Sequence, residues 1–399
     1  MTRQRLDAAP GSTSTLRTAN QHRVLDVLRG LGVVDPAVAG EDVDALPAEY
    51  TQAELARTTG LAPATVSNIL RDLSSAGLVA IAPGSGRRGS SVRLAETAGV
   101  VAGVDFGHSH VAVAVGDLAG RLLHEERRPL HSGLDHRAAL TCAHDMLRGM
   151  LPAGPTLRTV GLGLPAPVTA DVVQSSAILP SWVGVNARTA AEQVFGATAL
   201  VENDANLGAL AEHRRGVGRG HRSSVFVKIS SGVGAGVVIR NELFRGAHGS
   251  AGEIGHLTLD EQGPLCRCGS RGCLEAYTSI GTVQSMMGGQ LPGAVIEEIV
   301  DAALAGNVAA QRAFEDVGLH LGWGLASIVN LLDPDIVVVG GDMARAGELV
   351  LEPARVGLRR HALDAAALTP VLASELGNRA SLVGAVIVAA ERTELIAPA

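Results

Sequence analysis

Apolar and polar residues alternate with helical spacing in two N-terminal stretches of the chain. Residues 20–32 and 61–77 carry apolar side chains three and four positions apart, which predicts two amphipathic helices. Between them, 50–60 opens with a threonine and a glutamate at capping-box spacing and ends on glycine, which predicts a short helix. Residues 78–94 then predict a strand, a glycine-rich turn and a second strand. This order of elements favours a winged helix-turn-helix domain over 19–95.

Two further stretches of the N-terminal part lack a clear period. Residues 1–18 are polar and predict a disordered tail. Residues 33–50 are acidic, contain two prolines and predict a loop whose purpose the sequence does not reveal.

Beyond the wing, the pattern becomes that of an α/β protein. Residues 100–128 predict strand, short loop, strand, turn and strand, and 223–246 repeat this plan. The repeat suggests two similar lobes with a cleft between them, over 98–399. Helices are predicted over 135–151, 203–214, 294–305 and 308–332. Residues 333–343 predict a buried strand that enters a glycine turn, where ligands often bind in α/β sheets.

Composition narrows the class of protein. A chain of 399 residues with 46% hydrophobic and 18% charged residues is typical of a globular protein of two or three domains. No run of apolar residues is long enough to predict a membrane span, and the first twenty residues lack the apolar segment of a signal peptide. We therefore expect a cytoplasmic protein whose thiols stay reduced.

The net charge of −7 argues against general nucleic-acid binding, but the charge is unevenly distributed. Residues 1–95 hold ten arginines and nine acidic residues, so this segment is nearly neutral while the remainder is acidic. A nearly neutral segment on an acidic body still permits a local contact with DNA.

The second amphipathic helix and the wing supply the residues expected to contact DNA. Small side chains near the start of the helix would let its backbone approach base edges, and an asparagine there can pair with adenine. The basic wing tip would reach phosphates or the minor groove. The candidate residues are Thr65, Ser67, Asn68, Arg71, Arg87 and Arg88. The alternative is a small helical domain that only packs or binds protein.

Three of the four cysteines lie within eight positions, and a histidine precedes them. His256, Cys266, Cys268 and Cys273 would bind tetrahedral Zn²⁺, at roughly 2.3 Å from each sulfur and 2.0–2.1 Å from nitrogen. Four protein ligands leave no open position, so this zinc loop over 256–273 would be structural. The alternative is a disulfide with buried cysteines. The remaining cysteine, Cys142, is expected in a helix core.

The segment "GEIGHLTLDEQGPLCRCGSRGCLEAY" resembles the signature of the ROK family, which contains bacterial repressors and sugar kinases. The resemblance continues as a series of motifs in order over roughly 98–395. It implies an actin-like α/β fold of two lobes, duplicated and similar to ribonuclease H, around a cleft. An N-terminal winged helix-turn-helix is similar to the repressor branch, whose members sense sugars.

The resemblance also implies a sugar site. Carboxylates and amides recognise sugar hydroxyls through paired hydrogen bonds. The implied sugar-binding residues are Asn203, Asp204, Glu253, His256 and Glu275. His256 would then act twice, with one ring nitrogen on zinc and the other toward the sugar. Each polar residue has a simpler alternative, because Asn203 and Asp204 can begin a helix, Glu275 can cap one and Glu253 can be solvated.

The kinase branch of the family also binds ATP and Mg²⁺ through glycine loops. The matching positions are Asp105, Gly107, Ser109, Gly232, Gly234, Gly236, Gly340 and Gly341. The first loop departs from the kinase pattern, because His108 stands where a second glycine would be and would crowd the backbone amides. The segments expected near the sugar also differ from the kinase pattern, at Ala166, Ala177 and Ile178.

Two functions follow as expectations. The first is a sugar-responsive regulator, a homodimer or homotetramer that binds operator DNA and a sugar or sugar phosphate. The second is an ATP-dependent sugar kinase with an appended DNA-binding domain, in which Asp204 would be the general base. A body that only oligomerises, without sensing a sugar, is a third possibility.

Overall fold

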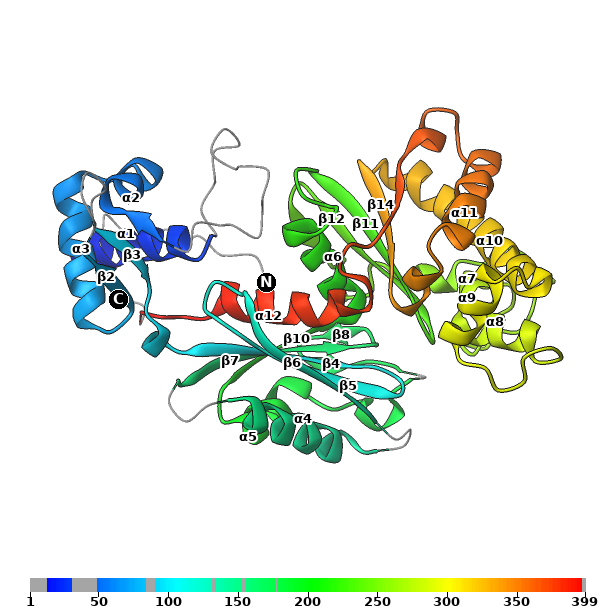
Figure 1. Ribbon diagram of the computed structural model, residues 1–399, viewed down its shortest axis with the longest axis horizontal. Coiled ribbons are helices and arrows are strands. Elements are labelled where there is room, and N and C mark those ends of the chain that lie inside the picture. The colour runs from blue at the N-terminus through cyan, green and yellow to red at the C-terminus, as the bar shows by residue number, and fades with distance from the viewer. Residues whose placement is uncertain are drawn as a thin grey trace.

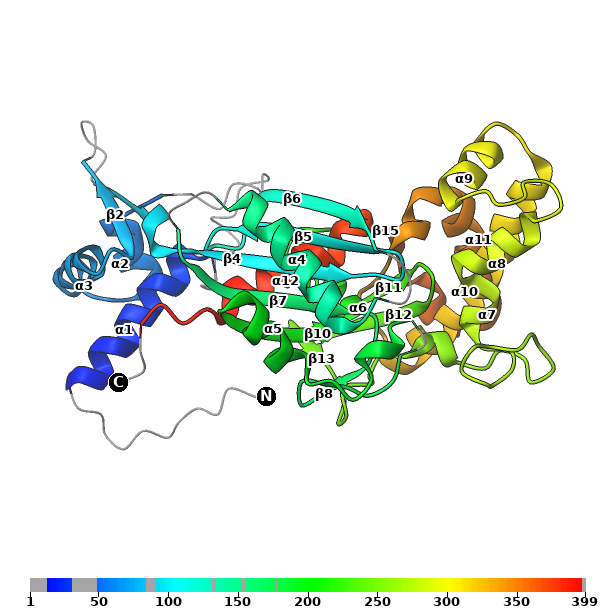
Figure 2. The same ribbon diagram turned by 90° about the horizontal axis from the view of Figure 1, so that it is seen from below.

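The structure is a computed structural model that describes residues 13–30, 49–83, 90–130, 134–151, 155–176 and 178–396. Within these residues, a winged helical domain lies at one end of the molecule, two β-sheets form the middle, and a group of helices forms the other end (Figures 1 and 2). Most of the predicted loop 33–50 and the predicted wing tip with Arg87 and Arg88 lie outside the described residues.

The N-terminal domain contains the elements that the apolar pattern predicts. They are α1 (Thr13–Leu28), β1 (Tyr50–Thr51), α2 (Gln52–Thr59), α3 (Pro63–Ser75), β2 (Val79–Ala82) and β3 (Ser91–Leu94). The three strands form an antiparallel sheet in the order β1-β3-β2. The capping box is present, since Thr51 Oγ1 accepts the Glu54 N–H and the Glu54 carboxylate accepts the Thr51 N–H. Helix α1 begins earlier than predicted, so Thr13 to Thr18 are helical although we expected a tail there.

The first lobe is a five-stranded sheet in the order β10-β7-β4-β5-β6. Its strands are β4 (Val100–Phe106), β5 (His110–Gly116), β6 (Leu122–Pro129), β7 (Leu157–Leu164) and β10 (Thr198–Asn203). Strands β10, β7 and β4 are parallel, and β5 and β6 continue antiparallel. Helices α4 (His136–Met150) and α5 (Ala187–Phe195) cover one face of this sheet (Figure 1).

The second lobe repeats this topology in the order β15-β14-β11-β12-β13. Its strands are β11 (Ser223–Ile229), β12 (Val233–Ile239), β13 (Glu242–Phe244), β14 (Ile336–Gly340) and β15 (Val371–Ala373). Again three strands are parallel and two follow antiparallel. The prediction of two similar lobes with an actin-like α/β fold is therefore confirmed.

Two helices, α6 (Asp204–Arg215) and α12 (Ala380–Arg392), lie between the two sheets (Figure 1). Helix α12 packs on β4 and β7, and α6 packs on β11 and β12. The approach is close, because a β-carbon on Gly161 of β7 would come 2.1 Å from the Ala385 carbonyl oxygen. The C-terminal residues Leu395 and Ile396 then pack against the core of the winged domain.

The remaining helices form the far end of the molecule (Figure 2). They are α7 (Leu274–Thr278), α8 (Ile280–Met287), α9 (Ile296–Leu304), α10 (Val308–Leu332) and α11 (Glu348–His361). Helices α4, α6, α9 and α10 match the predicted ranges to within two residues at each end. Within the described part of the chain, no helix combines the length and the apolar character that a membrane crossing requires.

Candidate functional site

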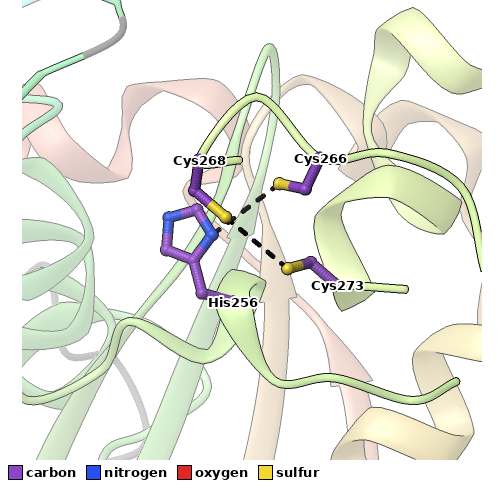
Figure 3. Close-up of side chains that lie close together, drawn as sticks. All are labelled: His256, Cys266, Cys268 and Cys273. Carbon is purple, nitrogen blue, oxygen red and sulfur yellow. Dashed lines mark hydrogen bonds between the residues drawn. The ribbon is translucent and has the colours of Figure 1, made fainter. Parts of the chain in front are cut away.

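The three clustered cysteines and His256 converge on one point (Figure 3). Their ligand atoms all lie within 4.8 Å of one another. The Cys268 and Cys273 sulfurs are 3.7 Å apart, and the Cys266 sulfur is 3.9 Å from His256 Nδ1. A tetrahedral ion with arms of about 2.3 Å has ligands about 3.8 Å apart, so these residues fit a metal ion.

The alternative of a disulfide is not realised. All four cysteines are free, and the 3.7 Å between the Cys268 and Cys273 sulfurs is far longer than an S–S bond. Cys142 lies apart in α4, partly buried against the core of the first lobe, as expected.

Short backbone bridges and a glycine turn hold the cysteine loop in place. Thr258 pairs with Cys273, and Leu265 pairs with Arg271. Gly272 has a φ of +64°, and a β-carbon there would come 1.6 Å from the Asp260 carbonyl oxygen. Only glycine fits this position, so the local sequence fixes the path of the loop between Cys268 and Cys273.

Glu275 follows the last cysteine at the start of α7 and is buried. Its Oε2 accepts the Val233 N–H at 2.9 Å, and its Oε1 lies 2.7 Å from Arg267 Nε. Glu275 therefore connects the metal loop to the second glycine loop, and its orientation is fixed from both sides.

Asn203 and Asp204 begin helix α6, as the simpler interpretation expected. Asn203 Oδ1 accepts the N–H groups of Ala205 and Asn206, which makes it the N-cap. Asp204 is buried, and its Oδ2 lies 2.7 Å from Lys228 Nζ. Burial raises the pKa of Asp204 above its usual value, and the neighbouring Asp105 adds to this against the opposing effect of Lys228.

Glu253 and His256 lie on the same side of the second lobe, at the short helical turn 254–256. Burial raises the pKa of Glu253, and the nearby carboxylates of Asp204 and Glu275 raise it further, against the effect of His256. The ring of His256 directs Nδ1 toward the sulfurs and Nε2 away from them (Figure 3). The carboxylates of Asp204 and Glu275 thus lie near enough to Glu253 to affect its pKa, and Nε2 of His256 does not face the sulfurs.

The first glycine loop is filled by the protein itself. Asp105 ends β4 and is buried, and its Oδ2 lies 3.6 Å from His110 Nε2. A β-carbon on Gly107 would come 2.1 Å from His110 Cε1, so the imidazole lies directly against this glycine. Ser109 is exposed beside it.

Several of the other glycines predicted to bind a nucleotide are explained by packing. A β-carbon on Gly236 would come 2.4 Å from the Ala205 carbonyl oxygen of α6, and one on Gly340 would come 2.4 Å from the Phe226 ring. Gly232 lies against Glu275, and Gly341 has a φ of +79° beside Ile229. Gly234 has the most room, since its nearest neighbour would be 3.6 Å away.

Helix α3 has the predicted inner and outer faces. The buried residues are Val66, Ile69, Leu70 and Leu73. Thr65 and Ser67 are partly exposed, and Asn68 and Arg71 are exposed. The outer face therefore remains available for a partner.

Lys228 and Arg267 were not among the sequence-predicted residues, although both contact a predicted carboxylate. Lys228 interrupts the apolar strand segment "SSVFVKIS", which was a signal that could have found it. Arg267 lies between two cysteines, and the sequence suggested for it only a general offset of the charge of the metal site.

Comparison with known proteins gives a consistent result. A sequence model described as "ROK family" matches residues 101–392. The xylose repressor of Bacillus spizizenii is 29% identical over 314 residues, which span 76% of this chain and 81% of the repressor.

Two similar solved structures differ in how much of this chain they cover. A ROK family glucokinase from Streptomyces griseus, solved with glucose and AMPPNP, is 31% identical with a TM-score of 0.66 and covers 73% of this chain and 100% of its own. A ROK family transcriptional regulator, described as a homologue of the Escherichia coli MLC protein, is 22% identical with a TM-score of 0.73 and covers 94% of this chain and 96% of its own. The likeness to the regulator thus extends over nearly the whole fold.

Proposed function

The chain belongs to the ROK family, and we propose that it is a sugar-responsive transcriptional regulator that binds DNA and represses genes of carbohydrate metabolism. The observation that carries this proposal is the winged helix-turn-helix domain attached to the ROK body. The relatedness to a xylose repressor and the fold likeness to a transcriptional regulator support it. Such a protein acts in the cytoplasm, on the DNA it regulates.

DNA recognition is assigned to the exposed face of α3. Asn68, which is exposed on this face, would pair with adenine in the major groove, and exposed Arg71 would contact a phosphate. Thr65 and Ser67 let the helix backbone approach the bases. Arg87 and Arg88 of the wing, outside the described residues, are assigned to phosphates or the minor groove. A homodimer or homotetramer would place two such helices on a palindromic operator.

The effector is a sugar or a sugar phosphate, bound by Asn203, Asp204, Glu253, His256 and Glu275. The converging carboxylates and the free His256 Nε2 support this assignment. The metal is Zn²⁺ on His256, Cys266, Cys268 and Cys273, and its role is structural because four protein ligands close the coordination sphere. Zinc would fix the ring of His256 so that Nε2 points at the effector.

Helix α12 connects the cleft to the DNA-binding domain. At its start, Ser381 Oγ donates to the Asp204 carbonyl oxygen at 2.9 Å. Just beyond its end, the Thr393 carbonyl oxygen accepts a hydrogen bond from buried Arg29, the residue after α1, at 2.8 Å. A ligand that favours one arrangement of the lobes would thereby bias the position of the recognition helix.

A mobility-shift assay on promoter fragments from the neighbourhood of the gene tests this function. We expect a specific shift at moderate salt that one sugar or sugar phosphate weakens. Absence of a specific shift, with and without a panel of sugars, would remove the regulator assignment.

A second candidate function is an ATP-dependent sugar kinase with an appended DNA-binding domain. It is favoured by Asp204, a buried carboxylate at the cleft that is placed as a general base for a sugar hydroxyl. ADP release with hexoses and amino sugars tests it, and turnover that disappears in Asp204→Asn would support the kinase. The His110 ring, which lies against Gly107 in the first glycine loop, weighs against this candidate.

A further inference from the structure

Lys228 is the only lysine in a chain with 33 basic residues, so every other basic residue is an arginine. It lies in β11, and its side chain is only 15% exposed. An arginine carries a planar fork with five donors, whereas a lysine ends in a compact ammonium. The single lysine therefore stands where a small, buried positive charge is needed.

The ammonium of Lys228 joins elements from both lobes. Its Nζ lies 2.7 Å from Asp204 Oδ2 of α6 and 3.0 Å from Ser381 Oγ of α12. Asp105 of β4 and Asp342, which follows the second-lobe strand β14, also interact with it, and all three carboxylates raise the pKa of Lys228 above its ordinary value although burial opposes this. The ammonium is thus charged in the folded protein.

Asp105 and Asp204 are carboxylates of the kind that hold a divalent cation in phosphoryl-transfer sites. Mg²⁺ is usually held by one or two carboxylates beside the loops that bind the phosphates. Here Asp105 is 2% exposed, and its Oδ1 has no hydrogen-bond partner within the described part of the chain. An ammonium 2.7 Å from Asp204 and within the electrostatic influence of Asp105 repels Mg²⁺ from these carboxylates.

The neighbouring positions for phosphate oxygens are filled as well. The His110 ring lies against Gly107 in the first loop. In the second lobe, the Asp342 N–H donates to Ser230 Oγ at 3.2 Å and is therefore not free for a phosphate. Arg127 of the first lobe lies 3.6 Å from Asp342 of the second, so an ion pair closes the same edge of the cleft.

We propose that Lys228, paired with Asp204, is a built-in counter-ion that takes the place of the Mg²⁺–nucleotide charge for Asp204 and Asp105, so that the cleft binds a sugar without nucleotide. This inference rests on the proposed function, because it explains how a kinase-like body responds to a sugar alone. It makes Lys228 the residue that determines which ligands the cleft excludes.

The uniqueness of Lys228 permits a test on the unaltered protein. Protein labelled with ¹³C and ¹⁵N in lysine gives a single side-chain Nζ signal in the NMR spectrum. We expect the paramagnetic complex of Mn²⁺ with AMPPNP to leave this signal sharp at millimolar concentration. Selective broadening that excess Mg²⁺–AMPPNP reverses would place the nucleotide beside Lys228 and overturn the proposal.

A variant without the charge of Lys228 also tests the proposal, because it should gain metal binding. In Lys228→Met the apolar stem remains and the charge is lost, so Mn²⁺ should bind the freed carboxylates at least about tenfold more tightly than in wild type. Mn²⁺ electron paramagnetic resonance on zinc-loaded protein measures this, and Lys228→Met/Asp105→Asn should lose the gain. A folded Lys228→Met protein without the gain, or a gain that persists in the double variant, would contradict the proposal.

The NMR experiment decides the question even if Lys228→Met fails to fold. The outcome is also separate from that of the DNA-binding assay. A protein that shifts no promoter but excludes Mn²⁺–AMPPNP would lose the regulator assignment and keep the inference about Lys228.

Discussion

Replacing Gly384 by alanine should destabilise the protein, because α12 and α6 touch at this glycine. A β-carbon on Gly384 would come 2.0 Å from the Leu207 carbonyl oxygen, 2.5 Å from its carbonyl carbon and 2.9 Å from its Cα. Ordinary contact begins at 3.4 Å, so the two helices would have to separate by more than an ångström. Helix backbone of a buried element cannot move aside as the end of a side chain can.

The expected magnitude follows from two opposing terms. Overpacking of a core costs about 1–3 kcal/mol, and contact with three backbone atoms favours the upper end of this range. Alanine in place of glycine within a helix stabilises the folded state by about 1 kcal/mol. We therefore expect Gly384→Ala to lower the free energy of unfolding by about 2 kcal/mol and the Tm by about 4 °C.

Gly149→Ala is the matched control. Gly149 also lies in a helix, α4, but a β-carbon there meets no heavy atom within 4 Å. The same substitution should then raise the free energy of unfolding by up to about 1 kcal/mol. Differential scanning fluorimetry and urea titration measure both variants. Shifts of the same sign and size would show that α6 and α12 do not pack as described, and would remove the basis for coupling through α12.

Three further predictions concern the metal site, the stability of the protein at acid pH and the binding of DNA. Cys268→Ser should lose the zinc and lower the Tm, whereas Cys142→Ser should retain it, and elemental analysis of both proteins checks this. Burial alone would raise the pKa of Asp105, but Lys228, His110 and Arg127 hold this pKa below its usual value. The ionised carboxylate therefore stabilises the folded protein above about pH 4, and this stabilisation disappears as the pH falls further. Asp105→Asn should therefore flatten the acid limb of the stability–pH curve, and an unchanged limb in urea titrations from pH 3 to 6 would refute the argument. Asn68→Ala should weaken specific operator binding by about 1–3 kcal/mol while non-specific binding persists, with Ser74→Ala at the exposed end of the same helix as the control in a mobility-shift titration.

Helices whose sequence carries polar positions could be predicted, whereas a helix that is apolar on every side could not. Helices α2 and α10 have capping signals, and α3 has a clear apolar face. Helix α12 was missed because every residue from Ala380 to Ala390 is buried, so its sequence has no polar face to reveal the period. Strand β7, which has parallel neighbours on both sides, was also missed, although β14 has the same surroundings and was predicted.

Some residues of the candidate site could also be predicted from the sequence, and others could not. The metal ligands are predictable because cysteine is scarce and its chemistry is specific, and the four side chains do converge. The partners of Lys228 are not predictable, since Asp105 and Asp204 come from separate elements that only the packing of α6 and α12 on the two sheets brings together. A lone charged residue in an apolar strand shows that a partner must exist, but the pattern does not say which.

The carboxylates of the cleft are held in place before any sugar arrives, and this limits where the energy of a response can arise. Glu275 accepts a hydrogen bond from Val233 and forms an ion pair with Arg267, and Asp204 accepts hydrogen bonds from Ala205 and Lys228. An ionised carboxylate has about four acceptor sites, so each still has room for sugar hydroxyls without giving up its present partners. Binding to such fixed groups costs little side-chain entropy and contributes affinity in any arrangement of the lobes. A response requires contacts that differ between arrangements, so the signal must come from groups whose distance to these carboxylates changes when the lobes move. Since α12 contacts Asp204 and, beyond its end, Arg29, we expect a rotation of this helix to move the DNA-binding domain.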